Sequence, residues 1–354
     1  MRDIVDIFAT LGVELQGFGR DATTADIIDA AIEQNPWFTP TDIERAVEAI
    51  RIEMLDRTKF ELWLSNYTPV AHPERVAIIM AGNIPLVGFF DLLCVLCSGH
   101  KAYIKPSSKD TILMRYIVDT LRSIEPNIAI YDYSSKEQYD RVIATGGEEA
   151  NRYFESHFAG TKRLLRGSRH SVAVLNGTES ADELMALTED ITAYSGLGCR
   201  SVSMIFAPEG YNLSLPYTDA INPKLRRNIA SMRALYTLQQ RPYEDFGAYL
   251  AVESGTFSES LALVVVQRYN DISQVERWLE QHRDHIQCVV SKCDIEGCTP
   301  FGRAQYPTLW DYADGVDTMK FLTEYRVQRT EYREQSTENR EQRTENREQM
   351  KDER

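Results

Sequence analysis

The sequence is short of positive charge and of long apolar runs. Its 39 Lys and Arg residues face 53 Asp and Glu residues, which gives a net charge of −14. A phosphate backbone or an anionic lipid surface would repel such a chain, so we expect no nucleic-acid partner. The longest apolar run, 84–99, carries Asp91 and is too short to cross a bilayer, and the N-terminus lacks the pattern of a signal peptide. These absences predict a cytoplasmic protein without a membrane span.

Cysteine is also scarce, with six residues at positions 94, 97, 199, 288, 293 and 298. Without a secretory context, these cysteines do not indicate a disulfide framework. Cys94 and Cys97 form a C-x-x-C pair inside an apolar, helix-like run, where core packing explains them better than redox or zinc chemistry. The last three cysteines stand five residues apart, which matches no common zinc pattern, so we predict no metal site.

The chain has 354 residues, which suffice for two domains with a hydrophobic core each. The spacing of its apolar residues changes along the sequence. Apolar residues three and four apart predict helices over 1–70, the last of which opens on Pro40 with a Thr41 cap. Over 71–178, and again over 179–300, short apolar runs alternate with helical patterns. This alternation predicts an α/β fold with a parallel, doubly wound sheet followed by a second α/β region.

The expected elements place a cleft between two sheets, with Cys199 at the seam. Strands are expected over 75–80, 101–105, 127–133, 140–145, 162–166, 171–175, 201–208, 261–269 and 286–290, and helices over 86–99, 110–124, 147–158, 179–196 and 271–283. From 328 to 354 the chain is a polar seven-residue repeat without the apolar positions of a coiled coil. We expect this tail to be a solvated extension with no fold of its own.

Polar and glycine residues follow several predicted strands, at the edge where α/β sheets bind nucleotides. Asn83 follows the first strand, and Lys105-Pro106 closes the second. Thr145-Gly146-Gly147 precedes a helix, where glycines let phosphate approach the backbone and the helix N-terminus favours its charge. Each also has a plainer explanation, as a turn-forming Asn, a solvent-facing Lys or an ordinary loop. The chain has no G-x-G-x-x-G fingerprint in the right context.

The stretch Ala193–Ser203 sets Cys199 between glycines and an arginine. Gly196 and Gly198 permit close approach of the backbone, and Arg200 would lower the pKa of the thiol, as a nucleophile requires. The alternative is that Cys199 is a small buried hydrophobic residue.

In their order along the chain, these motifs resemble the aldehyde dehydrogenase superfamily, and most closely its acyl-CoA reductase (LuxC) family. The resemblance is carried by the Asn83 turn, Lys105-Pro106-Ser107, Thr145-Gly146-Gly147 and Gly-x-x-Cys199, and it runs from about Val76 to Leu322. It implies an aldehyde dehydrogenase-like α/β fold with a Rossmann-type cofactor domain over 71–178 and a catalytic domain over 179–300. The helical N-terminal region would precede them, and a closing segment over 301–327 would lead into the polar tail.

The resemblance also implies roles for single residues. Cys199 would be the nucleophile, and Asn83 would hold the oxyanion together with the Cys199 backbone N–H. Lys105 would contact the adenosine ribose, and Ser107 would lie near the 2′-phosphate of NADPH, with NADH as the alternative cofactor. The other cofactor-binding residues that it implies are Pro106, Thr145, Gly146 and Gly147.

These roles describe an acyl-CoA reductase that converts a fatty acyl thioester into an aldehyde. Cys199 would attack acyl-CoA or another acyl thioester, coenzyme A would leave, and hydride from NADPH would lead to the aldehyde. The stretch 163–175 contains Gly167 but no glutamate that could activate water, which suits a reductase. The family's E-x-F-G-P glutamate is also missing, and Phe301-Gly302 is its nearest counterpart.

Other functions fit the same residues. A reductase of acyl phosphates would use the same cysteine, and a degenerate, non-catalytic nucleotide-binding interaction protein would keep the same fold. A cysteine hydrolase would need a partnered histidine, and none of the six histidines lies in a recognisable dyad, although His170 is an outside candidate for activating the thiol. The sequence leaves open whether the chain forms a homo-oligomer.

Overall fold

The computed structural model describes residues 2–324, so the polar repeat predicted over 328–354 lies outside the described residues. The N-terminal region is helical, as predicted, and contains α1 (Ile4–Glu14), α2 (Ala22–Gln34), α3 (Pro40–Ala49), the π-helical turn η1 (Ile50–Met54) and α4 (Arg57–Leu64). The cap of α3 is Thr39 rather than Thr41, because Pro40 takes the first helical position and the Thr39 hydroxyl accepts the Asp42 N–H.

The first sheet has five parallel strands in the order β3-β2-β1-β4-β5. They are β1 (Arg75–Ile79), β2 (Lys101–Lys105), β3 (Ile130–Asp132), β4 (Arg141–Thr145) and β5 (Lys162–Arg166), connected through α5 (Phe89–Cys97), α6 (Thr111–Ile124) and α7 (Glu148–His157). The strand order reverses between β1 and β4. Open α/β sheets bind ligands beyond the carboxyl ends of their strands at such a switch point. The loops after β1 and β4 therefore occupy the binding edge of this sheet.

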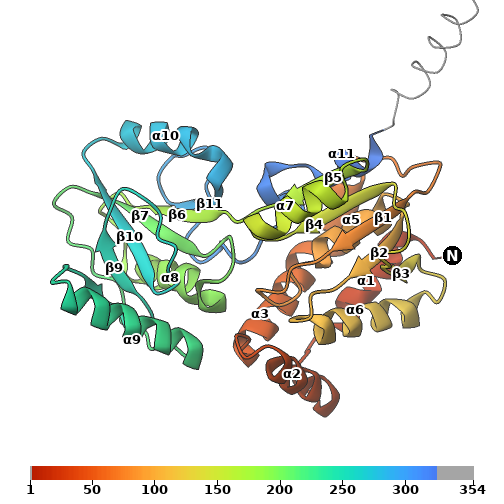
Figure 1. The fold of residues 1–354 in the computed structure, drawn as a ribbon, viewed down its shortest axis with the longest axis horizontal. Coiled ribbons are helices and arrows are strands. Elements are labelled where there is room, and N and C mark those ends of the chain that lie inside the picture. The colour runs from red at the N-terminus through yellow and green to blue at the C-terminus, as the bar shows by residue number, and fades with distance from the viewer. Residues whose placement is uncertain (1, 325–354) are drawn as a thin grey trace, which may run out of the picture.

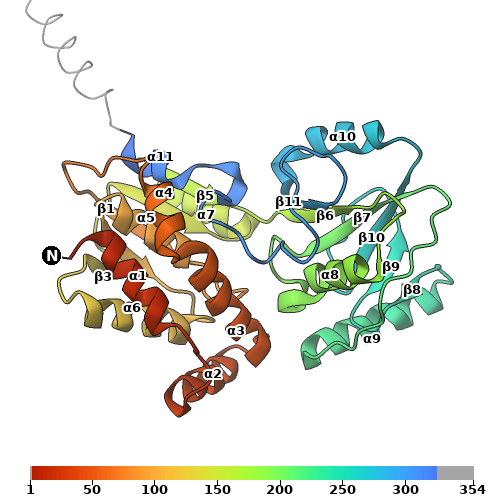
Figure 2. The same cartoon turned by 180° about the vertical axis from the view of Figure 1, so that it is seen from behind.

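One face of the first sheet shares its core with the N-terminal helices. Phe8 and Trp63 from those helices belong to the same buried cluster as Leu92 of α5 and Ile117 of α6. On the other face, Phe154 of α7 and Phe158, the residue after this helix, pack against side chains of β1 and β4. Figures 1 and 2 show the resulting layers, with the N-terminal helices on one side of the sheet and α7 on the other.

The second sheet has six strands in the order β11-β6-β7-β10-β9-β8, of which the β8–β9 pair alone is antiparallel. The strands are β6 (His170–Val174), β7 (Val202–Pro208), β8 (Glu244–Asp245), β9 (Leu250–Glu253), β10 (Leu263–Tyr269) and β11 (Ile286–Ser291), and the helices are α8 (Ala181–Thr192), α9 (Pro223–Leu238) and α10 (Ile272–Gln281). No element is predicted between 209 and 260, although α9, β8 and β9 lie there. The two sheets form separate lobes (Figure 1).

The passage between the lobes lies earlier than the predicted boundary at 178. β5 pairs with β4 in the first sheet, whereas β6 pairs with β7 and β11 in the second. The chain therefore changes sheet across Gly167-Ser168-Arg169. β5 and β6 are both short apolar runs, and only three residues separate them. Their hydrophobic patterns are alike, so the sheet to which each belongs follows only from strand pairing in the structure.

The closing segment returns to the first lobe. Its helix α11 (Thr318–Thr323) lies against α5, and Met319 and Leu322 enter the core shared with the N-terminal helices. The Trp63 Nε1–H donates to the Tyr312 hydroxyl at 2.8 Å, so α4 and the closing segment are tied directly. Ala304, nearer the start of the segment, is buried in the core of the second lobe, so residues over 301–324 connect the two lobes.

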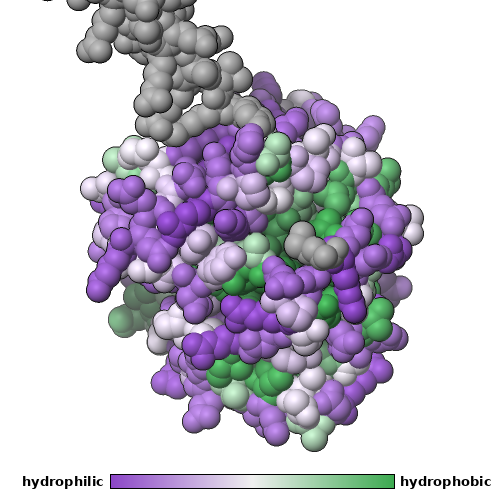
Figure 3. Space-filling model, turned by 90° about the vertical axis from the view of Figure 1, so that its right-hand side faces the viewer, coloured by the Kyte–Doolittle hydropathy of each residue, from purple (hydrophilic) through white to green (hydrophobic). Residues whose placement is uncertain are grey.

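Hydrophilic residues predominate on the end of the molecule formed by the first lobe, around smaller apolar areas (Figure 3). Within residues 2–324, no helix has both the length and the apolar character needed to cross a bilayer. The same range holds no group of three or more His, Cys, Asp or Glu residues placed to bind a metal ion.

Candidate active site

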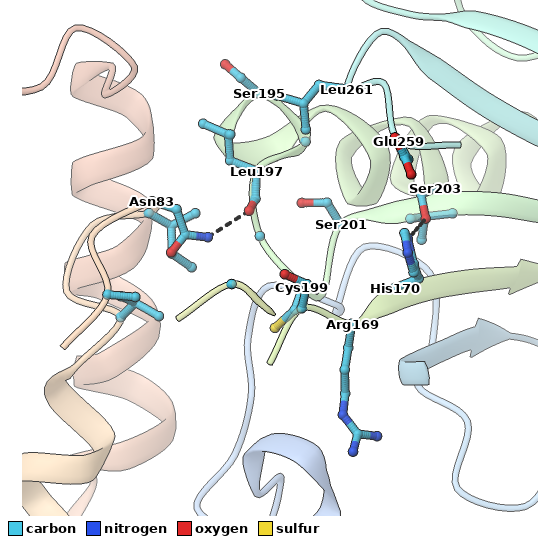
Figure 4. A pocket seen from close by; sticks show the side chains of 18 of the residues that line it. Asn83, Arg169, His170, Ser195, Leu197, Cys199, Ser201, Ser203, Glu259 and Leu261 are labelled. Atoms are coloured by element: carbon cyan, nitrogen blue, oxygen red, sulfur yellow. Dashed lines mark hydrogen bonds between the residues drawn. The ribbon is translucent and has the colours of Figure 1, made fainter. Parts of the chain in front are cut away.

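A cavity of about 750 Å³ lies between the lobes. Its walls include the loops after β1 and β4, the loop from α8 to β7, and the loop from β9 to β10 (Figure 4). The sequence-predicted residues on its walls are Asn83, Ser107, Thr145, Gly146, Gly147 and Cys199. The cavity thus brings together side chains that are more than a hundred residues apart in the chain.

Lys105 and Pro106 do not line this cavity. Lys105 is the exposed last residue of β2, and its Nζ lies 5.9 Å from the centroid of the Tyr133 ring. Lys109, on the following turn, is on the cavity wall instead. The roles of Lys105 and Pro106 in cofactor binding stay predictions.

The segment before Cys199 is a strained turn. α8 ends at Thr192, four residues before the predicted end, and Tyr194 and Ser195 then adopt φ values of 53° and 56°. Gly196 follows with φ 75°, a conformation that glycine adopts freely. For residues with side chains this region costs about 1–3 kcal/mol each, and it persists where the surroundings enforce it. The loop that carries Cys199 is therefore held in place by its contacts.

Asn83 contacts that loop directly. Its Nδ2 donates to the Leu197 carbonyl oxygen at 2.8 Å, as the dashed line in Figure 4 shows. The Cys199 carbonyl oxygen accepts the Ser171 hydroxyl at 2.9 Å. The backbone of the Cys199 loop is thus held from both lobes, by Ser171 at the cysteine itself and by Asn83 at Leu197, two residues before it.

The Asn83 loop is fixed by contacts with the turn that follows β2. Leu86 has φ 56°, and its N–H donates to Asp110 Oδ2 at 2.8 Å. A Cβ at Gly82 would lie 2.6 Å from the Ser107 side chain, so this position requires glycine. Because of this turn, α5 begins at Phe89 rather than at 86 as predicted.

The electrostatics of Cys199 differ from the prediction. Burial raises the pKa of the Cys199 thiol above its ordinary value, and Arg200 opposes this increase without reversing it. Arg200 is engaged elsewhere, since its Nε donates to the Ala304 carbonyl at 2.6 Å and its Nη2 lies 3.7 Å from Asp311. Sequence adjacency alone suggested a stronger effect of the guanidinium than its orientation allows.

His170 lines the cavity but pairs with other groups. Its Nδ1 lies 3.1 Å from the Ser203 hydroxyl, and its ring stacks on Phe257 with centroids 4.0 Å apart. Burial, together with His285, lowers the pKa of His170, which favours the neutral imidazole. In Figure 4 the ring faces Ser203 rather than the sulfur of Cys199.

A second, smaller cavity also reaches Cys199. It measures about 180 Å³, and its apolar wall comes from Ala46, Ala49, Ile50, Met54, Phe89 and Phe90. Arg166, Asp311 and Asp314 are the charged residues at its border besides Arg200. The N-terminal helices therefore contribute to a cavity that Cys199 also lines, which no pattern in the sequence indicates.

The turn before α7 is suited to an anion. Gly147 caps the helix without a side-chain hydrogen bond, and nothing lies within 4 Å of a Cβ built there. The backbone at Gly147 therefore borders open space beside the positive end of the α7 dipole, and no side chain caps the first N–H groups of the helix. Ser107 and Lys109 line the same cavity, whereas Glu148 and Glu149 in the first turn of α7 would oppose an anion.

Sequence reasoning missed several residues on the cavity wall. Arg169 forms an ion pair with Asp314 at 2.9 Å, and Glu259 lies on the loop between β9 and β10. Glu259 falls in the region where no element was predicted, so no periodic pattern singled it out. Phe301-Gly302, by contrast, lies off the wall, and the Gly302 N–H donates to Asp190 at 2.7 Å.

The family model described as "Acyl-CoA reductase (LuxC)" matches residues 37–240, which is more than half of the chain. The chain belongs to the LuxC acyl-CoA reductase family. The matched range contains Asn83, Ser107, Thr145 and Cys199. A curated LuxC-like relative, long-chain acyl-protein thioester reductase 2 of Photobacterium leiognathi, is 24% identical over 146 residues. That match covers 36% of this chain and 30% of the relative, so the chain spans under a third of that relative's length.

Solved structures place the fold of this LuxC-family chain among aldehyde dehydrogenases. Aldehyde dehydrogenase 21 from Physcomitrella patens superposes with a TM-score of 0.57 at 10% identity, covering 82% of this chain and 73% of that one. An aldehyde dehydrogenase from Bacillus cereus gives 0.55 at 13% identity, covering 83% and 73%. The predicted family and the aldehyde dehydrogenase-like α/β fold are confirmed. The roles of the site residues stay predictions.

Proposed function

We propose that this LuxC-family protein reduces an acyl thioester to an aldehyde through an acyl group carried on Cys199. The observation that carries the proposal is the position of Cys199, which lines both the large cavity of mixed polarity and the smaller, mostly apolar one. A thioester substrate has an apolar chain and a reacting carbonyl. With the chain in the small cavity and the carbonyl at the border of the large one, both would lie next to the Cys199 sulfur.

The large cavity fits a nicotinamide dinucleotide. Open space at Gly147, the unsatisfied N–H groups that begin α7, and Ser107 with Lys109 suit a pyrophosphate-bearing ligand. The Bacillus cereus structure is a complex with NAD+. We propose NADPH, with Ser107 near its 2′-phosphate and NADH as the alternative, and such a cofactor would supply the hydride.

In the acylation step, the Cys199 thiol loses its proton to water in the cavity, and the resulting thiolate forms a bond to the carbonyl carbon of the thioester. The carbonyl oxygen gains the negative charge, and the Asn83 Nδ2–H and the Cys199 backbone N–H hold it. Collapse of this intermediate breaks the bond to the sulfur of coenzyme A, which leaves as a thiolate, while the acyl group stays on Cys199. For this step Asn83 exchanges the Leu197 carbonyl, its present acceptor at 2.8 Å, for the oxyanion.

The surroundings of Cys199 favour reduction over hydrolysis. The stretch 163–175 contains no glutamate to activate a water molecule. Ala49, Ile50 and Phe90 line the same small cavity as Cys199, and an acyl chain there would keep water from the thioester. An acyl-enzyme in these surroundings should persist until hydride reaches it.

The mass of the intact protein after exposure to acyl-CoA, without reductant, tests the proposal. We expect a single added acyl group that maps to Cys199, disappears in Cys199→Ala and is lost again when NADPH is added. Cys298→Ala is the matched control, because Cys298 is also a free, partly exposed cysteine, and it should keep the adduct. An adduct that survives in Cys199→Ala, or no adduct from acyl-CoA in the wild type, would sink the proposal, and an adduct from acyl phosphate alone would favour the rival substrate.

A further inference from the structure

The strained turn before Cys199 is held by the N-terminal helices. The Tyr194 N–H donates to Asp42 Oδ1 of α3 at 2.9 Å, a buried hydrogen bond between residues 152 positions apart. The buried Tyr194 side chain packs with Ala46, one turn further along α3, and with Ile84 of the Asn83 loop. A carboxylate from outside both sheets therefore fixes the first left-handed residue of the turn.

Asp42 is in turn oriented by its own helix start. The Thr39 hydroxyl donates to Asp42 Oδ2 at 2.7 Å, and it accepts the Asp42 N–H as the cap of α3. With one oxygen on Thr39 and the other on Tyr194, the carboxylate has little freedom to rotate. Asp42 is 7% exposed, so water cannot readily replace it as the acceptor for Tyr194.

The connection from α2 to α3 reaches both lobes. Asn35 Nδ2 donates to the Gly82 carbonyl at 3.3 Å, next to Asn83. Asn222, the cap of α9 in the second lobe, donates to the Pro36 and Trp37 carbonyls at 3.0 Å each. The segment 35–42 thus contacts the Asn83 loop, the Cys199 loop and the second lobe, and we name it the brace.

We propose that Asp42 is a positioning residue for Cys199. It imposes the left-handed turn at Tyr194 and Ser195, and this turn fixes the position of the Cys199 loop relative to Asn83. The inference rests on the proposed function for its catalytic readout, but not for its effect on the thiol. Removing the carboxylate should relax the turn, expose the sulfur and misplace it at the same time.

The experiment compares Asp42→Ala with Asp42→Asn in the full chain. The asparagine keeps an oxygen that can accept the Tyr194 N–H, whereas alanine leaves this donor buried without a partner. Glu48→Gln is the matched control, because Glu48 is a carboxylate of the same helix that pairs with Arg51 at the surface. The readouts are kcat and KM for acyl-CoA reduction, and the alkylation rate of Cys199 with iodoacetamide. Cys94 and Cys97, which are fully buried in α5, report global loosening in the same samples.

In Asp42→Ala we expect kcat to fall and Cys199 alkylation to rise, each by about tenfold, with KM changed far less and Cys94 and Cys97 unaffected. Asp42→Asn and Glu48→Gln should stay within about threefold of the wild type. Alkylation rising at all three cysteines together would overturn the inference, because Asp42 would then serve folding alone. An unchanged Cys199 alkylation rate in Asp42→Ala would also overturn it. A wild type without turnover would refute the proposed function, while the alkylation rates would still decide the role of Asp42.

Discussion

At the scale of single residues, neighbours in sequence are poor guides to electrostatic partners. Arg200 follows Cys199 directly, yet its guanidinium is committed to Ala304 and Asp311, and burial decides the pKa of the thiol. Asn83, 116 positions before the cysteine, donates to the backbone beside it. The order of motifs brought the right residue types to attention, but only the folded chain assigns the contacts.

Asp110 offers a test by pH. Burial raises the pKa of Asp110 from 3.8 to about 8, although the hydrogen bond from the Leu86 N–H works against this shift. The folded protein therefore keeps a proton that the unfolded chain releases between these pH values. Stability should fall as the pH rises from about 4 to about 8, by up to ~1.4 kcal/mol per pH unit, and level off above that range.

Asp110→Asn should flatten this dependence, because the amide keeps an oxygen for Leu86 but has no proton to lose. Urea unfolding at several pH values measures the difference. Asp119→Asn, which changes an exposed carboxylate of α6, should leave the slope of the wild type. Parallel pH profiles for the wild type and Asp110→Asn would contradict the assignment.

At the scale of elements, the sequence predicted those parts that are governed by periodicity. β2 and β5 have the predicted bounds, and β1 and β4 differ from them by one residue. β8 and β9 were missed because they have two and four residues, too few for a period to appear. α8 ends early, just before Tyr194 donates to Asp42, and no local pattern encodes this contact.

The wall of the small cavity could be found only from the fold, because it joins α3 and η1 to α5. Ala49, the last residue of α3, is buried in this wall. The cavity, at about 180 Å³, is close in size to the engineered cavity of about 150 Å³ that holds a benzene molecule. An acyl chain of about six carbons would fill it.

Ala49→Val should therefore shorten the acyl chains that the protein accepts. The two added methyl carbons occupy space that the far end of the chain needs, so kcat/KM for hexanoyl-CoA should fall by about tenfold or more relative to acetyl-CoA. Ala22→Val, an exposed substitution at the start of α2, should leave this ratio unchanged. A chain-length profile of Ala49→Val that matches the wild type would place the acyl group elsewhere.

At the scale of the whole molecule, segments that the sequence presents as separate regions share one core. The helices of 1–70 and the closing segment pack on the same face of the first sheet, and the brace and Asn222 tie that lobe to the second. Hydrophobic periodicity in the sequence suggests separate regions, whereas the buried side chains of these regions form a single core. The change of sheet at Gly167-Ser168-Arg169 is likewise set by which strands pair in the folded protein and not by a change in composition.

The hydrogen bonds of Tyr312 connect the closing segment to α4 and to Tyr67, which follows that helix. Its hydroxyl accepts the Trp63 Nε1–H at 2.8 Å and pairs with the Tyr67 hydroxyl at 2.5 Å. Tyr312→Phe leaves the Trp63 donor without this acceptor and should lower the free energy of unfolding by about 1–3 kcal/mol. Tyr306→Phe, which keeps the ring under Arg303, is the control. Equal denaturation midpoints for the two variants would show that the hydrogen bonds of Tyr312 do not contribute to the free energy of unfolding.

Cys199 is shared by both cavities, together with Ile84, Val87, Thr145 and Gly167. A ligand in either compartment should therefore slow alkylation of this one sulfur. Protection of the thiol, measured with each ligand alone and with both, would report which of them binds first, before any acyl group is transferred.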